Sequence, residues 1–445
     1  VYVVQWSLFN TGTGDIVDRD FLAATGWGGS SYTGTRAAAP FAILDTILDA
    51  INLVVSVDPG VTMGPLDAFW SVNNTLTGER DFEDGRLPTT FYSSNPDGDF
   101  TRNPSLFLLG DAEGRFPNST IDTDEFDRGT IAHEWGHYFE DELARSDSIG
   151  GRHVVPGTVE PRVAFGEGWG YGFAGMAIGN PQVCDTGAPA SSGFEFNVET
   201  PFSGIVGTRG FFNEVSIATF LYDLWDTTDD GLDDNSIGFA PIYNTMLGPQ
   251  ANTEAFTTVF SFATELQSML NAADSAFIDA LLNRDTIDTD NLDIWGSGQT
   301  TVPVGSRDLL PVYTVLPTNG SIVQVCANSD FAQGQDGNKP GEWRYLRFTT
   351  TSTTSWTITA AANPVPPPTT DSPPAADRSD PDLWLYRDGE FLGVGGSGDA
   401  DIETFTTPTL SADTYVIALQ EWRYEDPDIS SDFPTQVCFD ISMTP

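Results

Sequence analysis

The chain has 445 residues, of which 19 are Lys or Arg and 64 are Asp or Glu, so its formal net charge is −45. This charge argues against a nucleic-acid-binding function, because phosphate neutralisation needs Lys and Arg, and against docking on an anionic membrane. Hydrophobic residues make up 39% of the chain, which is enough to bury a core. A carboxylate-rich surface with one lysine, Lys339, is typical of halophilic or marine proteins and predicts a soluble monomer.

We identify no run of about 18 apolar residues and therefore expect no membrane insertion. The nearest candidate, residues 41–57, is interrupted by Asp45, Asp49 and Asn52. Because the sequence begins at Val1 without a signal-peptide pattern, we expect a secreted, extracellular chain that is processed from a longer precursor.

The chain contains three cysteines, Cys184, Cys326 and Cys438. The last two lie near the ends of the final third of the chain, so a disulfide that closes this segment is expected in an extracellular protein, with Cys184 left free. The alternative is three reduced, buried thiols.

The pattern of apolar residues predicts an α+β chain of two domains. Helices are predicted over 39–55, 214–225 and 253–282, and a short strand over 107–109. After a linker near residue 300, alternating segments with turn residues between them predict an antiparallel β-sandwich, with strands over 343–348, 355–360, 383–386 and 414–419. The domains are therefore expected to span 1–300 and 308–445, and 364–374 is predicted to be a proline-rich surface loop.

The strongest motif is His-Glu-x-x-His over residues 133–137. On a helix, His133 and His137 project from one face, close enough to bind one Zn²⁺, and Glu134 points towards the metal-bound water. Three carboxylates precede this helix, namely Asp122, Asp124 and Asp127. They are expected to favour its start through the helix dipole. The alternative is a surface helix with two solvated histidines.

A catalytic zinc ion needs a third protein ligand and one open position. The only other histidine is His153, and the metzincin spacing would require a histidine where Leu143 stands. Glu167 is the better candidate, because its segment is rich in small residues, is predicted to be helical and can pack closely on the first helix. The alternative is a glutamate at a glycine-rich turn.

His133-Glu134-x-x-His137, followed by Gly166-Glu167-Gly168-Trp169, resembles the gluzincin metallopeptidases, in particular the fungalysin type. In that family a Gly-Glu-Gly-Trp stretch supplies the third zinc ligand, so the resemblance implies this role for Glu167. It also implies a two-lobed catalytic domain with a β-containing lobe over about 1–145, a helical lobe over about 146–300, and the zinc between them. The resemblance is specific over about 105–175 and weakens to a helical outline over 210–285. It departs at Tyr171, where the family has an aspartate that orients a zinc histidine.

These parts predict a zinc metallopeptidase, more precisely an endopeptidase, that acts on proteins or peptides. Glu134 acts as the general base on zinc-bound water and then passes the proton to the leaving amine. The oxyanion needs a further donor, for which His153, Tyr222 and Tyr243 are candidates, with Tyr243 preferred. By resemblance, an extended substrate pairs with an edge strand that contains Phe107, Leu108 and Leu109; the alternative is an internal strand.

A second metal is predicted in the acidic loop around Gly231, because clustered carboxylates bind Ca²⁺. Its candidate ligands are Asp226, Asp229, Asp230 and Asp233. The alternative is a solvated acidic loop in a strongly acidic protein. Residues 95–99 are a weaker copy.

From about Pro311 the chain resembles the bacterial pre-peptidase C-terminal domain, on Asp380-Pro-Asp-Leu-Trp-Leu-Tyr386, Asp388-Gly389 and residues 412–417. Such domains accompany secreted bacterial peptidases and are often removed on maturation, and a disulfide between Cys326 and Cys438 would tie the first strand to the last. The rival hypotheses are an extracellular adhesion or glycan-binding protein with a structural zinc, an aminopeptidase of the same clan, and a zymogen with a covered cleft.

Overall fold

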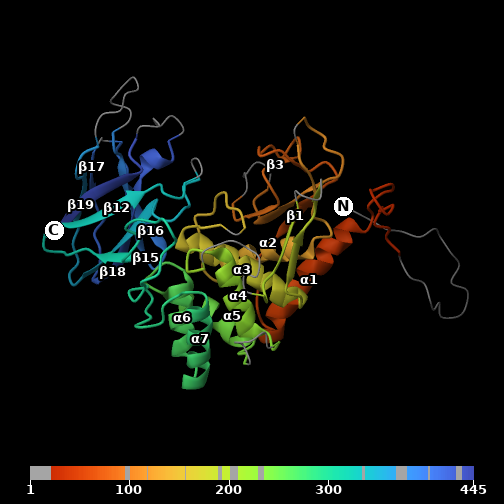
Figure 1. Cartoon of the computed structure of the whole chain (residues 1–445), viewed down its shortest axis with the longest axis horizontal. Coiled ribbons are helices and arrows are strands. Elements are labelled where there is room, and N and C mark those ends of the chain that lie inside the picture. The colour runs from red at the N-terminus through yellow and green to blue at the C-terminus, as the bar shows by residue number, and fades with distance from the viewer. Residues whose placement is uncertain are drawn as a thin grey trace, which may run out of the picture. The chain divides into compact units, whose positions relative to one another are not determined.

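The computed structural model describes residues 22–95, 101–117, 119–155, 157–188, 193–200, 209–228, 235–332, 336–366, 378–398, 401–426 and 433–445. The chain divides into two compact units, one of residues 1–139 and 173–198, the other of residues 140–172 and 199–445. It is an α+β protein with a helical middle region and a C-terminal region of β-strands, as predicted (Figure 1). The expected domain boundary between 300 and 308 stays a prediction.

The first unit contains a three-stranded sheet that packs on helix α1 (Ala39–Val57). Its strand order is β1 (Asp67–Trp70), β5 (Ser105–Leu108) and β4 (Phe91–Ser93), with β5 parallel to β1 and antiparallel to β4. Ile43 of α1, Leu108 of β5 and Ile131 of helix α2 form a buried cluster. The shorter strands of this unit are β2 (Thr75–Leu76), β3 (Arg86–Leu87), β6 (Gly110–Asp111), β7 (Ile121–Thr123), β8 (Gln182–Asp185), β9 (Gly187–Ala188) and β10 (Phe194–Asn197).

The structure corrects the prediction that Phe107, Leu108 and Leu109 belong to an edge strand. Phe107 pairs with Phe69 on one side and with Phe91 on the other, so both edges of β5 are occupied. All three side chains are buried. They therefore cannot pair with a substrate backbone, and the edge strands of this sheet are β1 and β4.

Helix α1 runs two residues beyond the predicted end. It is also more similar to a membrane-spanning helix than we expected from the sequence. By length and composition it is the one described helix that would be able to cross a membrane, because Asp45 and Asp49 are its only charged residues. In the structure one face of α1 is buried, and this face is formed by Ala39, Ile43, Thr46, Ala50 and Val54.

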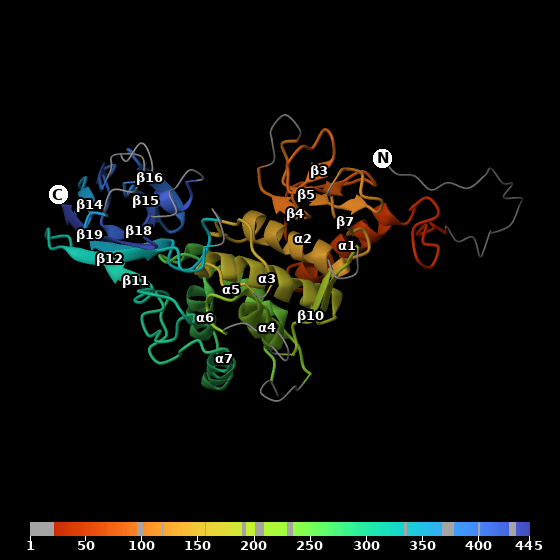
Figure 2. The same ribbon diagram turned by 45° about the horizontal axis from the view of Figure 1, so that its top comes forward.

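The second unit contains a group of helices that lie together in both views (Figures 1 and 2). Helix α4 (Glu214–Trp225) has the predicted bounds, and α5 (Phe239–Leu247) was not predicted. The predicted helix over 253–282 is instead two helices, α6 (Val259–Ser268) and α7 (Ala272–Arg284), preceded by the short η2 (Gln250–Asn252). The break follows from Asn271, whose side chain accepts hydrogen bonds from two backbone amides and caps the start of α7.

The C-terminal strands form two sheets that face each other across one core. One sheet has the order β11 (Tyr313–Val315), β13 (Trp343–Thr350), β18 (Asp413–Glu421), β15 (Pro381–Arg387), β16 (Glu390–Gly395). The other has the order β12 (Val323–Asn328), β19 (Gln436–Thr444), β14 (Thr357–Ala362), β17 (Ile402–Thr406). All neighbouring strands are antiparallel except β11, which is parallel to β13. Alternate residues of β19 enter the core, as the two-residue period of a strand requires.

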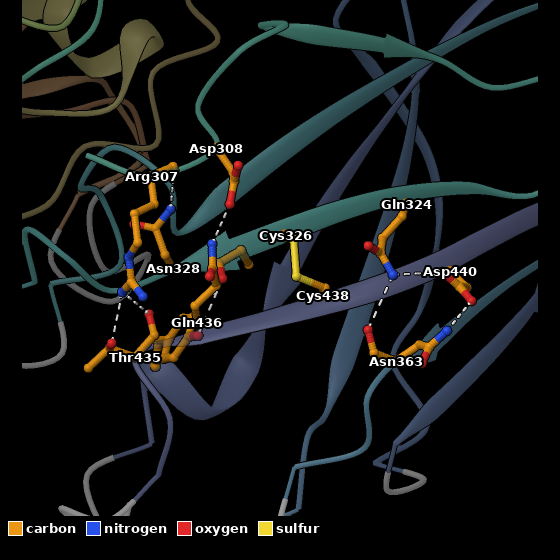
Figure 3. The surroundings of a disulfide bond; sticks show 12 residues. Arg307, Asp308, Gln324, Cys326, Asn328, Asn363, Thr435, Gln436, Cys438 and Asp440 are labelled. Carbon is orange, nitrogen blue, oxygen red and sulfur yellow. Dashed lines mark hydrogen bonds between the residues drawn. A yellow bond between two sulfur atoms is a disulfide. The ribbon is translucent and has the colours of Figure 1, made fainter. Parts of the chain in front are cut away.

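Cys326 of β12 and Cys438 of β19 face each other in the strand register and form the expected disulfide (Figure 3). Cys184 is free, also as expected. Figure 3 shows polar contacts on both sides of the bond, including that of the Gln324 amide with the Asp440 carboxylate at 3.0 Å. The bond joins the last strand to β12 rather than to the first strand, β11.

Within the second unit the β-strands pack on the helical region through a buried polar cluster. The Arg162 guanidinium of helix α3 (Pro161–Ile178) lies 4.7 Å from the ring centre of Phe256 and 5.1 Å from that of Tyr345. Its Nε donates to Glu160 Oε1 at 3.1 Å, and the Tyr345 hydroxyl donates to the same oxygen. Nearby, the Lys339 ammonium donates to the Arg152 carbonyl oxygen at 2.8 Å. The only lysine of the chain therefore holds the β-region on the helical region.

Candidate metal centre

Helix α2 (Arg128–Glu142) carries the His-Glu-x-x-His motif. The four-residue spacing stacks the two imidazoles on one helical face, and their Nε2 atoms lie 3.0 Å apart. Two nitrogens that share one tetrahedral zinc at 2.0–2.1 Å lie about 3.3 Å apart. His133 is buried and His137 half-buried. The pair therefore has the spacing that one metal ion requires.

Glu134 lies between the two histidines in sequence and is held from outside the helix. Its Oε2 accepts a hydrogen bond of 2.7 Å from the backbone amide of Tyr92, which belongs to the edge strand β4. The side chain is only 8% exposed. A backbone donor fixes the orientation of this carboxylate independently of any metal.

Helix α3 carries Glu167, so the glycine-rich segment around it is helical, as predicted, and not a turn. A Cβ atom at Gly168 would lie 2.4 Å from Ile217 Cβ of α4, and one at Gly172 would lie 3.0 Å from Leu221 Cβ. The glycines therefore allow the backbones of α3 and α4 to approach closely. This contact fixes the part of α3 that bears Glu167.

The same helix continues to Phe173, which packs on α2. The Phe173 ring is 5.3 Å from the Trp135 ring and 5.7 Å from the Phe139 ring, measured between centroids. One carboxylate oxygen of Glu167 and one ring nitrogen each of His133 and His137 lie within 4.8 Å of one another. The three residues that the sequence predicted as zinc ligands thus form one buried or half-buried group.

His153 lies beside Glu167. Its Nε2 is 3.3 Å from Glu167 Oε2 and 3.6 Å from Glu214 Oε2, and these three residues form a second group of metal-ligand type. Burial raises the pKa of Glu214 to about 7, while His153 lowers it and Glu167 raises it. The sequence named His153 among three candidate donors, but nothing in the sequence distinguished Glu214.

A cavity of about 260 Å³ adjoins His153. The helical region contributes Arg152 and Val159 to its wall, and the β-region contributes Phe331, Asp336 and Lys339. The β-region thus forms part of the surroundings of this histidine.

The remaining predicted site residues are the tyrosines Tyr222 and Tyr243 and the candidate calcium ligands. Tyr243 of α5 and Tyr222 of α4 are buried, and burial raises the pKa of Tyr222 far above its ordinary value. The role of Tyr243 as a donor stays a prediction. In the predicted calcium loop, Asp226 is buried, whereas Asp229, Asp230 and Asp233 lie outside the described residues. The calcium prediction for this loop also stays a prediction.

The carboxylates before α2 are arranged differently from the expectation. Asp122, Asp124 and Asp127 all precede the first residue of the helix, and its first turn contains no acidic residue. Asp122 and Asp124 instead form a group with Asp185, in which one carboxylate oxygen of each lies within 4.8 Å of the others. Burial, followed by repulsion from Asp122, raises the pKa of Asp185 to about 7.

No known protein family and no curated protein matches the sequence. One solved structure that aligns is the pre-peptidase C-terminal domain of collagenase from Bacillus anthracis, at 7% identity and a TM-score of 0.19, over 29% of this chain and 93% of that chain. Another is PliG of Aeromonas hydrophila, a periplasmic inhibitor of g-type lysozyme, at 11% identity and a TM-score of 0.16, over 29% of this chain and 95% of that chain. The first is of the kind that the C-terminal motifs resemble. At these TM-scores neither similarity identifies a fold or an activity.

Proposed function

We propose that the chain is a secreted zinc-dependent metalloendopeptidase of the gluzincin type. The observation that carries the proposal is the group of His133, His137 and Glu167, with Glu134 on the same helix as the two histidines. Two imidazoles and one carboxylate are the ligand set of catalytic zinc sites that leave a fourth position for water. A structural zinc site would use four protein ligands, and among the residues that the structure describes this group has three.

Zn²⁺ bound by these three side chains would lower the pKa of a water molecule and polarise the substrate carbonyl. Glu134 accepts the proton of the attacking water as the C–O bond forms, and it delivers that proton to the amine nitrogen as the C–N bond breaks. The Tyr92 amide supports this role, because it holds one carboxylate oxygen of Glu134 in place.

His153 is a stronger candidate than Tyr243 for the donor to the oxyanion. Two carboxylates, those of Glu167 and Glu214, lie within 3.6 Å of its Nε2, which places the imidazole beside the proposed metal ligand. An imidazole N–H in this position can donate a hydrogen bond to negative charge that develops at the metal.

Strand β4 replaces β5 as the proposed partner of the substrate backbone. It is an edge strand, and its Tyr92 contacts the proposed general base. Pairing of an extended peptide with such an edge depends on main-chain hydrogen bonds and accepts many sequences. This mode of binding suits an endopeptidase.

The test combines zinc analysis with proteolysis. The purified chain is expected to contain one equivalent of zinc and to digest casein. Glu134→Gln should keep the zinc, because glutamine has the same shape, and should lose activity by about 10² to 10⁴-fold. Glu142→Gln, which removes the same charge from the exposed end of α2, is the matched control and should remain active.

Other outcomes lead elsewhere. Zinc bound without digestion of any unfolded protein by the wild-type chain would favour the binding-protein hypothesis. Cleavage of peptides only when their amino terminus is free would identify an aminopeptidase. An active Glu134→Gln variant would refute the assigned general base.

A further inference from the structure

The acidic group of Asp122, Asp124 and Asp185 belongs to the first unit and lies outside the proposed zinc site. Asp122 is in β7, Asp124 follows that strand, and Asp185 ends β8. Strand β7 pairs with β6 on one side and with β9 on the other, so backbone hydrogen bonds fix the position of Asp122. The three carboxylates are therefore brought together by strands from distant parts of the sequence.

Two oxygen atoms in this group have no protein partner among the described residues. Asp124 is 1% exposed, and its Oδ1 accepts no hydrogen bond, whereas its Oδ2 accepts one from the Thr90 hydroxyl. Asp122 Oδ1 is also buried without a described partner. A buried carboxylate oxygen without a donor is costly, and it indicates a ligand that supplies positive charge.

The charged groups that act most strongly on Asp124 are all carboxylates, namely those of Asp122, Asp185 and Asp127. Hydrogen bonds at the neighbouring Thr186 help to position Asp185, the third carboxylate of the group. Asp127 Oδ2 accepts hydrogen bonds from the Thr186 amide at 2.7 Å and from the Thr186 hydroxyl at 2.8 Å. This fixes the residue next to Asp185 and leaves the Asp185 carboxylate to the group.

The spacing fits a divalent cation with oxygen ligands. Ca²⁺ binds oxygen at 2.3–2.6 Å, so two ligands on opposite sides of the ion lie about 4.8 Å apart. The three carboxylates have oxygens within this limit. Ca²⁺ takes six to eight ligands, and bidentate carboxylates, carbonyl groups and water fill the remaining positions.

We propose that Asp122, Asp124 and Asp185 bind a calcium ion that joins the entry of helix α2 to the segment after helix α3. Helix α2 begins at Arg128, four residues after Asp124, and β8 begins at Gln182, four residues after the end of α3. A Cβ atom at Gly129 would contact Val183, so the first turn of α2 also packs directly on β8. An ion here stabilises the start of the helix that carries both histidines.

The test measures the thermal midpoint of the full chain after removal of metal ions on a chelating resin and restoration of one equivalent of zinc. Added Ca²⁺ should raise the midpoint by several degrees at constant ionic strength, and Tb³⁺ should bind with a luminescence that Ca²⁺ displaces. Asp124→Asn and Asp185→Asn should each abolish the calcium-dependent rise and weaken Tb³⁺ binding at least tenfold. Asp45→Asn, which removes an exposed carboxylate from α1, is the matched control and should keep the full response.

The change in thermal midpoint that Asp124→Asn causes distinguishes a bound calcium ion from simple repulsion among the carboxylates. If the group held no cation, Asp124→Asn would relieve repulsion among buried carboxylates and raise the midpoint in every buffer. A midpoint that rises in this way would overturn the proposal. So would a calcium response that both variants retain, or an equal response to Mg²⁺ alone. Because the midpoint does not depend on catalysis, the test is independent of the proposed peptidase activity.

Discussion

Replacement of Gly168 by alanine tests whether close packing of α3 on α4 fixes the position of Glu167. In an isolated helix this substitution stabilises by about 1 kcal/mol, because alanine has the higher helix propensity. Here the added Cβ would lie 2.4 Å from Ile217 Cβ and 2.8 Å from the Glu214 carbonyl oxygen. Carbon atoms in contact prefer about 3.5–4.0 Å, so the helices must separate by about 1 Å or more.

Overpacking of this kind costs about 1–3 kcal/mol, and the carbonyl oxygen cannot move aside as a side chain would. Subtracting the propensity gain of about 1 kcal/mol leaves an expected loss of up to about 2 kcal/mol in the free energy of unfolding. Gly172→Ala is the matched control, because it has the same propensity gain one turn later, but its Cβ would lie 3.0 Å from Leu221 Cβ. We expect its effect to be close to zero.

The assay is urea denaturation followed by far-ultraviolet circular dichroism, with zinc affinity measured on the same samples. Gly168→Ala should unfold at a lower urea concentration than Gly172→Ala and should bind zinc more weakly, because Glu167 adjoins the displaced residue. Equal midpoints for the two variants would refute the view that helix contact explains the glycines.

Two further predictions concern the β-region. Serine replacement of Cys326 and Cys438 removes a link between residues 112 apart and should lower the free energy of unfolding by up to about 4.7 kcal/mol, measured by urea denaturation, whereas Cys184→Ser should have little effect. Burial raises the pKa of Glu421 from 4.5 to about 7, although the hydrogen bonds that its carboxylate accepts lower it. The protonated side chain therefore stabilises the fold fully below pH 4.5, and this contribution is lost as the pH rises through 7. Between pH 4.5 and 8 the unfolding free energy of Glu421→Gln should therefore fall by about 3 kcal/mol less than that of the wild-type chain. Glu390→Gln, at an exposed position, is the control and should follow the wild-type chain. An unchanged pH dependence in Glu421→Gln would contradict the assignment.

Local patterns in the sequence predicted much of the fold. The apolar spacing of α4 and the short apolar run of β18 depend only on residues a few positions apart, so both elements were found at nearly the observed bounds. The break before α7 depends on one capping side chain, Asn271, inside a pattern that otherwise continues.

Contacts between distant segments were harder to predict. The run Phe-Leu-Leu before Gly110 has the same composition in an edge strand and in a central strand, and only the pairing of β5 with both neighbours decides between them. The three ligand candidates of the zinc site were found because the motif fixes two of them within one helical turn, and because both the small-residue segment around Glu167 and the resemblance pointed to the third. The partnership of Asp124 with Asp185 spans 61 positions in the sequence and has no local pattern.

The buried cluster around Arg162 bears on what a proteolytic cut before the C-terminal strands would do. Domains of the type that these strands resemble are often cut off, but Trp343 and Tyr345 cover the Arg162 guanidinium, and Tyr345 also donates to Glu160. A hydrogen bond to a charged group, such as the one from Tyr345 to Glu160, contributes about 1.5–3 kcal/mol. A cut in the segment before Pro311 would therefore yield two polypeptides that remain associated and migrate as one particle, and they would separate only on denaturation.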